Sequence, residues 1–287
     1  DACGGCQLQH LHYGGQLNFK KAVLVNALTR IAKIPDAEKL VLPVIGMVKP
    51  YNYRNKAILA AGKVEDRVVL RFQEESSHQL TAQACRFLLA EPLLTVTAGL
   101  ENVLTKHKAI VGKGLLGAML RYSDYSHQIQ IIMIANRHFV NDESALIADI
   151  KKISLAVSGI GLAMASENRS AGMPAVYRGV EMRWGNLYLE EKTSAKVYRL
   201  SPASFFQVNT KQARVLYDKV KEFAGLTGSE VVLDAYCGTG TIGLYLVDQT
   251  AKLIGIDVVR EAIADACYNA EINGAPATFY LGKAENL

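Results

Sequence analysis

Three cysteines are the first residues of this chain whose type and spacing suggest chemistry. Cys3 and Cys6 bracket a Gly-Gly pair at the start of the sequence, and Cys85 follows far downstream. Two thiolates at Cys-x-x-Cys spacing can bind one metal centre through a tight turn, which glycine permits. Since only five cysteines occur in 287 residues, a disulfide framework is not indicated. Thiols that serve a metal in a reducing cytoplasm are favoured.

An iron–sulfur centre and zinc are the two candidate metal centres for these cysteines. A [4Fe–4S] cluster takes four cysteines, and Cys3, Cys6 and Cys85 supply three of them. Zinc is the alternative, but no second Cys-x-x-Cys and no paired histidines follow at finger spacing. The spacing also differs from the C-x-x-x-C-x-x-C of radical S-adenosylmethionine enzymes. We therefore expect a structural or ligand-binding role for the cluster rather than a redox role.

A glycine-rich turn near the C-terminal end could bind a nucleoside cofactor. The stretch VVLDAYCGTGTIGL places Gly238 and Gly240 between a β-branched strand and a helix, where glycine lets the backbone approach a ligand closely. The next strand ends in Asp257, which could accept hydrogen bonds from a ribose diol. Gly243 formally completes a dinucleotide pattern, which by itself is weak. The run D-x-x-C-G-T-G together with GID favours S-adenosylmethionine.

Basic residues in the stretch YRNKA could contact a polyanion. Arg54 and Lys56, with Lys49 nearby, are the best candidates for phosphate contacts, because lysine and arginine supply the salt-dependent part of nucleic-acid binding. The net charge of +5 is compatible with such a partner. The alternative is a solvated strand edge without a ligand.

The sequence around these residues predicts three parts. Residues 1–45 hold the cysteine segment and an amphipathic helix over 17–33. Residues 46–200 are predicted to form a mixed α+β domain, because strands and helices do not alternate regularly there. Its expected elements are strands at 55–62, 67–73 and 127–135, a helix at 142–153 and hairpin structure at 175–191.

Residues 201–287 follow a regular order of elements. A helix at 211–226 precedes a strand, the glycine-rich turn, a helix, a strand that ends in Asp257, a helix and a further strand. This order is typical of the first half of a doubly wound, Rossmann-like α/β domain. Its first strand would be an exposed edge. No apolar run approaches the ~20 residues that span a bilayer, and no signal peptide is visible, so we expect a cytoplasmic protein without a membrane partner.

Three stretches together resemble one family. DACGGCQLQHL, SPASFFQVNTKQARVLYD and VVLDAYCGTGTIGL are similar to the bacterial 23S rRNA uracil-C5 methyltransferases of the iron–sulfur type, and YNYRNKA also fits. The resemblance implies an oligonucleotide-binding β-barrel ahead of the cysteine motif, a central domain that grips RNA, and an S-adenosylmethionine-dependent methyltransferase domain. It also implies a fourth cluster cysteine upstream of residue 1.

The resemblance assigns roles to particular residues. It implies that Gln207 and Tyr236 line the S-adenosylmethionine pocket together with Gly238, Gly240 and Asp257.

Phe205 is implied as a stacking surface for the flipped uracil. An aromatic face offsets part of the cost of unstacking a base. The alternative for Phe205 and for Phe206 is packing in the core.

The family's chemistry uses a cysteine thiolate that adds to uracil C6, after which C5 takes the methyl group and a base removes the C5 proton. In the family that cysteine follows an Asp-Pro-Pro-Arg-like motif, which this chain lacks. Cys237, inside the cofactor turn, and Cys267, on a helix, are poor substitutes. We therefore expect the nucleophile and the base to lie beyond Leu287, and the chain to be an inactive fragment.

The leading hypothesis is a monomeric methyltransferase for uracil C5 in 23S rRNA, with S-adenosylmethionine and a [4Fe–4S] cluster as cofactors. One alternative is a tRNA uracil-C5 methyltransferase, although relatives of that kind are not expected to carry the cysteine cluster. Another is an iron–sulfur RNA-binding module without catalysis. A small-molecule methyltransferase is disfavoured by the large central domain and by SFFQVN.

Overall fold

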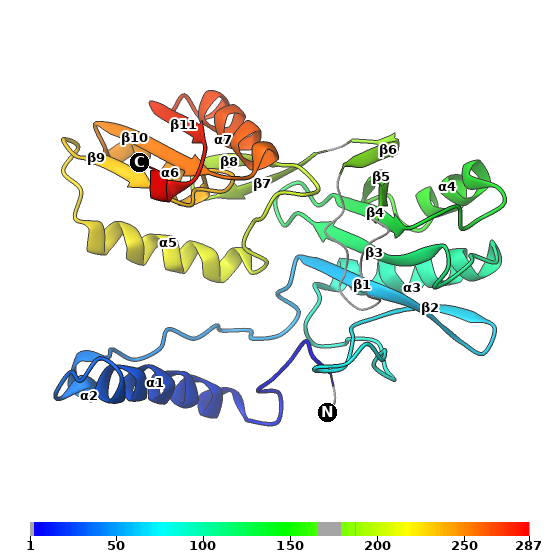
Figure 1. The fold of residues 1–287 in the computed structure, drawn as a ribbon, viewed down its shortest axis with the longest axis horizontal. Helices are drawn as coiled ribbons and strands as arrows, with labels where there is room; N and C mark the ends of the chain where they lie inside the picture. Colours follow the sequence, from blue (N-terminus) through cyan, green and yellow to red (C-terminus); the bar gives the residue numbers. More distant parts are fainter. Residues whose placement is uncertain (1–2, 166–178, 187, 287) are drawn as a thin grey trace.

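A computed structural model describes residues 3–165, 179–186 and 188–286. Their strands form a six-stranded sheet in the order β2-β1-β3-β4-β5-β6, a three-stranded sheet in the order β11-β10-β9, and the hairpin β7-β8 (Figure 1). The six strands of the large sheet are β1 (Lys56–Val64), β2 (Arg67–Arg71), β3 (Leu115–Tyr122), β4 (Ile129–Ala135), β5 (Val157–Met164) and β6 (Val180–Gly185).

The large sheet holds the main core. Every residue of β4 is buried, as expected for an apolar central strand. Helix α3 (Glu91–Lys106) covers the sheet with Leu93, Val96, Leu100 and Leu104, which recur at helical spacing and are all buried. Helix α4 (Glu143–Lys151) packs beside it. The result is the mixed α+β architecture that the sequence predicts for this region.

Helix α3 also protects one sheet edge. Strand β2 is the edge strand, and its unpaired backbone N–H groups would otherwise face solvent. Val68 N donates to Thr105 Oγ1 at 2.9 Å, and Leu70 N donates to Glu101 Oε1 at 2.7 Å. Side chains of the helix thus replace a seventh strand.

Most of the predicted elements of the first two parts are confirmed. Strands β1, β2 and β4 and helix α4 lie where the sequence predicts them. The first helix, α1 (Tyr13–Arg30), begins earlier than predicted, because His12 caps it by accepting a hydrogen bond from Gly15 N at 3.1 Å. It has no buried residue and lies apart from both sheets (Figure 1). The short helix α2 (Ala37–Leu40) follows it.

The hairpin predicted over 175–191 is wrong. Strand β6 pairs with β5, whereas β7 (Leu189–Thr193) pairs with β8 (Lys196–Leu200). The physical reason is the course of the chain after β6, where Asn186 N donates to Ser158 O at 2.9 Å and keeps this segment on β5. Residues 175–178 and 187 of the predicted hairpin lie outside the described residues.

The last part has the predicted α/β order. Strands β9 (Val231–Asp234), β10 (Lys252–Asp257) and β11 (Ala277–Leu281) are parallel. Between and before them lie α5 (Thr210–Ala224), α6 (Thr241–Leu246), the short η1 (Val247–Gln249) and α7 (Arg260–Ile272), and η2 (Ala284–Asn286) follows. Strand β9 is an edge of this sheet, and Val231 and Leu233 on it are exposed.

The loop of residues 201–208, which we call the linking loop, is held from two sides. Asp265 on α7 accepts hydrogen bonds from Ser201 N at 2.8 Å and from Ser204 Oγ at 2.6 Å. From the other side, Arg121 on β3 donates to the carbonyl oxygens of Ser201 and Ser204, at 2.9 and 2.6 Å. The loop therefore joins the large sheet to the parallel sheet through buried polar groups.

Among the described residues, none of the helices combines the length and the hydropathy that a membrane crossing requires.

Replacement of Asp265 should destabilise the protein. Asp265 is 2% exposed, so Asp265→Ala leaves buried donors without a partner, which costs about 1–3 kcal/mol. Glu222→Ala is the control, because the side chains of Glu222 and of its partner Lys219 are both exposed, and such a contact is worth about 0–1 kcal/mol. Urea unfolding measures both variants. Equal losses would show that the buried contacts of Asp265 do not hold the linking loop.

Candidate functional site

The glycine-rich turn and the end of β10 are joined by Asp257. Gly238 N donates to Asp257 Oδ2 at 2.9 Å, and Val259 N donates to Asp257 Oδ1 at 2.9 Å. Gly238 and Gly240 have φ angles of +53° and +78°, which side chains other than glycine rarely adopt. A Cβ at Gly240 would also meet the Phe279 ring at 3.0 Å. These contacts explain why the turn needs glycine.

A second carboxylate lies at the neighbouring strand end. Asp234 is the last residue of β9 and accepts a hydrogen bond from Gly243 N at 3.2 Å. Burial raises the pKa of Asp234, and the charge of Asp257 raises it further. Asp234 begins the run D-x-x-C-G-T-G but was given no role of its own, although its place at the end of a strand directly before the turn was a usable signal.

Tyr236 and Gln207 lie on different segments. Tyr236 follows β9, is 73% exposed, and donates from its hydroxyl to Glu285 Oε1 at 3.1 Å. Gln207 lies in the linking loop and is half-buried. Tyr236, Gly238, Gly240 and Asp257 thus gather at the carboxyl end of the parallel strands, the usual place for a ligand in such a fold.

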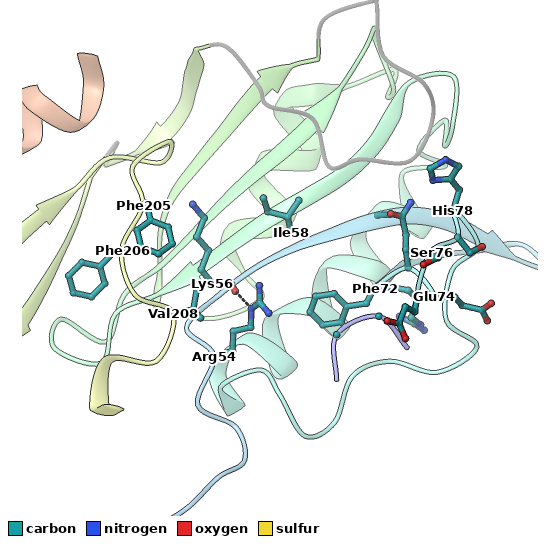
Figure 2. Close-up of a pocket in the computed structure, with 17 residues that line it drawn as sticks. Arg54, Lys56, Ile58, Phe72, Glu74, Ser76, His78, Phe205, Phe206 and Val208 are labelled. Carbon is teal, nitrogen blue, oxygen red and sulfur yellow. Dashed lines mark hydrogen bonds between the residues drawn. The ribbon is translucent and has the colours of Figure 1, made fainter. Parts of the chain in front are cut away.

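A cavity of about 670 Å³ brings together the three residues that the sequence analysis expects to contact RNA. Figure 2 shows Phe205 and Phe72 on opposite sides, with Arg54 and Lys56 between them. Phe205 is 66% exposed and so offers a ring face, whereas Phe206 is 3% exposed and packs against Tyr198 in the core. We call this space the aromatic–basic cavity.

The two basic residues of this cavity differ in character. Arg54 Nε donates to Lys56 O at 2.9 Å, and the guanidinium lies 5.9 Å from the centre of the Phe72 ring. Lys56 Nζ donates to Pro202 O at 3.4 Å. Burial lowers the pKa of Lys56 to about 7, and the positive charge of Arg121 lowers it as well. With this pKa, the Lys56 amine does not carry a full positive charge at neutral pH, unlike a lysine at a solvated strand edge. It is therefore suited to donating a hydrogen bond inside the cavity.

The cysteine segment forms another wall of the aromatic–basic cavity. Gly4 N donates to Gln73 O at 3.0 Å, and Gly4 and Gly5 line the cavity. Burial raises the pKa of Cys6, and the nearby Cys85 and Cys3 thiols raise it further. The three cysteines are thus close enough to interact electrostatically. Among the described residues, however, no group of three or more histidine, cysteine or acidic side chains is arranged to hold a metal ion.

The remaining two cysteines lack the properties of a nucleophile. Cys237 is buried, and burial, together with Asp234 and Asp257, raises the pKa of its thiol to about 12. A thiol with such a pKa is hardly ionised at neutral pH, and the thiolate is the reactive form. Cys267 lies exposed on α7 and does not line the aromatic–basic cavity.

Fold and site together define a class. The parallel sheet, the glycine turn and the acid at the end of β10 form the α/β fold of S-adenosylmethionine-dependent methyltransferases. A solved structure of the same kind is the tRNA (uracil-54, C5)-methyltransferase of Pyrococcus abyssi in complex with S-adenosyl-L-homocysteine. It is 25% identical to this chain with a TM-score of 0.76, and the match covers 98% of this chain and 66% of that one.

The sequence relatives are RNA methyltransferases by name. Two uncharacterized RNA methyltransferases, from Clostridium acetobutylicum and Halalkalibacterium halodurans, are each 35% identical over 99% of this chain. The chain spans 62% of the length of the first and 63% of the second. No protein-family model matches the chain.

The low pKa of Lys56 predicts a pH-dependent stability. The unfolded chain keeps the Lys56 proton up to about pH 10.5, whereas the folded protein loses it near pH 7. Between these values the unfolded state binds more protons, so the free energy of unfolding rises with pH. Lys56→Met should raise this free energy at pH 7 and flatten its rise up to pH 10, each unit of pKa shift being worth about 1.4 kcal/mol.

The measurement is urea unfolding at several pH values. Lys63→Met, at an exposed position of the same strand, is the control and should keep the profile of the unchanged protein. A Lys56→Met profile parallel to the control would contradict the assignment.

Proposed function

We propose that this protein methylates C5 of uracil in RNA with S-adenosylmethionine. The single observation that carries the proposal is the aromatic–basic cavity, in which Phe205 faces Arg54 and Lys56. The linking loop that carries Phe205 is fixed by Asp265 to α7, the helix that starts three residues after Asp257. A base in the cavity and a cofactor at the glycine turn would therefore be positioned by one set of contacts.

Different residues would bind the cofactor and the RNA. For the cofactor, Gly238 and Gly240 would admit its close approach and Asp257 would accept the ribose hydroxyls, with Tyr236 and Gln207 nearby. S-adenosylmethionine supplies the methyl group when bound.

For the RNA, the exposed ring of Phe205 would stack on the flipped base. Arg54 would contact a phosphate, and the amine of Lys56 would donate to a polar atom of the base.

The proposed reaction is a covalent one. A thiolate adds to C6 of uracil, and the electron pair moved to C5 takes the methyl group from the sulfonium, which leaves as a thioether. A base removes the C5 proton, and expulsion of the thiolate restores the double bond. Because Cys237 is buried and poorly ionised, we propose that another cysteine of the complete gene product supplies the thiolate.

We propose 23S rRNA as the substrate, bound by a monomer in the cytoplasm, on the resemblance of the cysteine and SFFQVN stretches. A tRNA is the second candidate, because the similar solved enzyme acts on tRNA by its name. Transfer of labelled methyl groups from S-adenosylmethionine to each RNA by the complete gene product, with mapping of the methylated product, distinguishes them. If RNA is bound but no RNA is methylated, the protein is a binding module instead.

Substitution at the glycine turn should abolish cofactor binding selectively. Gly238 and Gly274 both have positive φ, +53° and +57°, and a Cβ at either would meet nothing within 4 Å. Gly238→Ala and Gly274→Ala therefore introduce similar backbone strain, of about 1–2 kcal/mol. Calorimetry with S-adenosyl-L-homocysteine should show at least a tenfold loss of affinity for Gly238→Ala only. Matching affinities would place the cofactor elsewhere.

We propose further that Cys3, Cys6 and Cys85 bind a [4Fe–4S] cluster in the complete gene product. Their mutual proximity from two distant segments supports this, as does the preference of such clusters for thiolates. The arrangement of the described residues is not that of a closed metal site, and no step of the reaction is assigned to the cluster.

Iron and sulfide analysis after anaerobic purification tests the cluster. We expect about four iron atoms per chain, lost in Cys85→Ser and kept in Cys267→Ser. Zinc in place of iron would favour the alternative centre, and a protein without metal would contradict both.

A further inference from the structure

A second cavity lies at the start of α5, the helix that follows the linking loop. It has a volume of about 500 Å³ and opens between the turn after β3, the β7–β8 hairpin and the first turn of α5. The residues that matter for its chemistry are Tyr125, Lys192, Thr193, Thr210, Lys211 and Arg214. None of them belongs to the aromatic–basic cavity.

The exposed charge of this cavity is mostly positive. Lys192, Lys211 and Arg214 are exposed, and in the part of the chain that the structure describes no ion pair neutralises them. Lys192 Nζ lies 5.5 Å from the centre of the exposed Tyr125 ring. A cation trio beside an aromatic ring is the surface that nucleic-acid backbones prefer.

Two carboxylates line the same cavity. Glu191 is buried, accepts hydrogen bonds from the backbone N–H groups of Asp124 and Lys192 at 3.2 and 3.0 Å, and has its pKa raised by burial. Each of its carboxylate oxygens thus accepts a hydrogen bond from the backbone. Asp124 is exposed, so the exposed side chains comprise three cations and one carboxylate.

Two independent features favour an anion. Helix α5 has 15 residues, and the first N–H groups of a helix lack intrahelical partners and carry a partial positive charge. Asn209 caps only Gln212 N of that turn, at 3.1 Å. In addition, Thr193 is 2% exposed and lines the cavity, and its hydroxyl has no hydrogen-bond partner among the described residues. A buried hydroxyl without a partner is destabilising, and an acceptor that came within its reach would relieve this.

The two cavities are connected through the backbone. Val208 lines the aromatic–basic cavity, and Thr210 lines the second one. Asn55 binds both, because its N–H donates to Val208 O at 2.8 Å and its Nδ2 donates to Thr210 Oγ1 at 2.8 Å. The walls of the two cavities are therefore held together at residues 208 and 210.

We propose that this second cavity binds a phosphate group of the RNA chain whose uracil occupies the aromatic–basic cavity. The inference rests on the proposed function and deepens it, by adding an anchor for the nucleotide next to the target. Lys192, Lys211 and Arg214 supply the charge, the first turn of α5 supplies N–H donors, and Tyr125 offers its ring to a neighbouring base.

The test compares two double variants of α5 in the complete gene product. Lys211→Ala/Arg214→Ala removes two charges from the cavity. Lys219→Ala/Lys221→Ala removes the same charge from the same helix, outside the cavity. Binding of a uridine-containing single-stranded RNA is measured by fluorescence anisotropy over a series of salt concentrations, and S-adenosyl-L-homocysteine binding by calorimetry.

We expect the cavity variant to bind the RNA about tenfold more weakly and to lower the slope of log Kd against log salt by about 0.7, the contribution of one neutralised phosphate on a single strand. The control variant should differ little from the unchanged protein, and all three should bind S-adenosyl-L-homocysteine equally. Equal RNA affinity and slope for the two variants would overturn the phosphate site while leaving the proposed function intact.

Two further outcomes identify other failures. If the unchanged protein binds no RNA at all, the proposed function fails before the site is tested, and the inference falls with it. A separate titration with inorganic phosphate, read as a thermal shift, distinguishes the source of the anion. Suppose that phosphate raises the melting temperature of the unchanged protein but not of the cavity variant, while both bind RNA equally. The cavity would then be a site for free phosphate, and the assignment to RNA would be overturned.

Discussion

The structure depends on one pair of buried contacts, those of Arg121 and Asp265 with the linking loop. Arg121 belongs to the large sheet and Asp265 to α7, and each binds Ser201 and Ser204. A buried cation and a buried carboxylate are stable here because backbone and hydroxyl groups satisfy them. Because Arg121 and Asp265 both bind residues 201–204, the position of Phe205 is set by the large sheet and by α7 together. A ring on an unrestrained loop could not offer a defined surface to a base.

The aromatic–basic cavity is built from segments that lie far apart in the sequence. Its walls come from the cysteine segment, from β1 and β2, and from the linking loop. Arg54 connects two of these, because its positive charge also acts on Cys6. A change in the charge of the cysteine cluster would therefore be felt at the cavity wall. In the proposed function, this coupling would connect the cysteines to RNA binding without electron transfer.

Elements that depend on local sequence signals could be predicted from the sequence, whereas features that depend on contacts between distant residues could not. The order of elements after residue 211 was predicted well, because β-branched strands, a glycine turn and an amphipathic helix are local signals. No element was predicted at α3 or β3. The predicted partner of β6 was wrong, because strand pairing depends on contacts such as that of Asn186 with Ser158, which are distant in sequence. The buried state of Lys56 was equally hidden, because it arises from Pro202 and Arg121, far away in sequence.

The exposed edge of β9 has a practical consequence. Val231 and Leu233 lie at the border of the parallel sheet, where the backbone N–H and C=O groups of β9 that point away from β10 have no partner strand among the described residues. Such an edge, with apolar side chains, invites pairing with another copy of the chain. Concentrated solutions of this polypeptide should therefore self-associate through β9. A charged residue introduced at Val231 would be the simplest way to keep the protein dispersed for biophysical work.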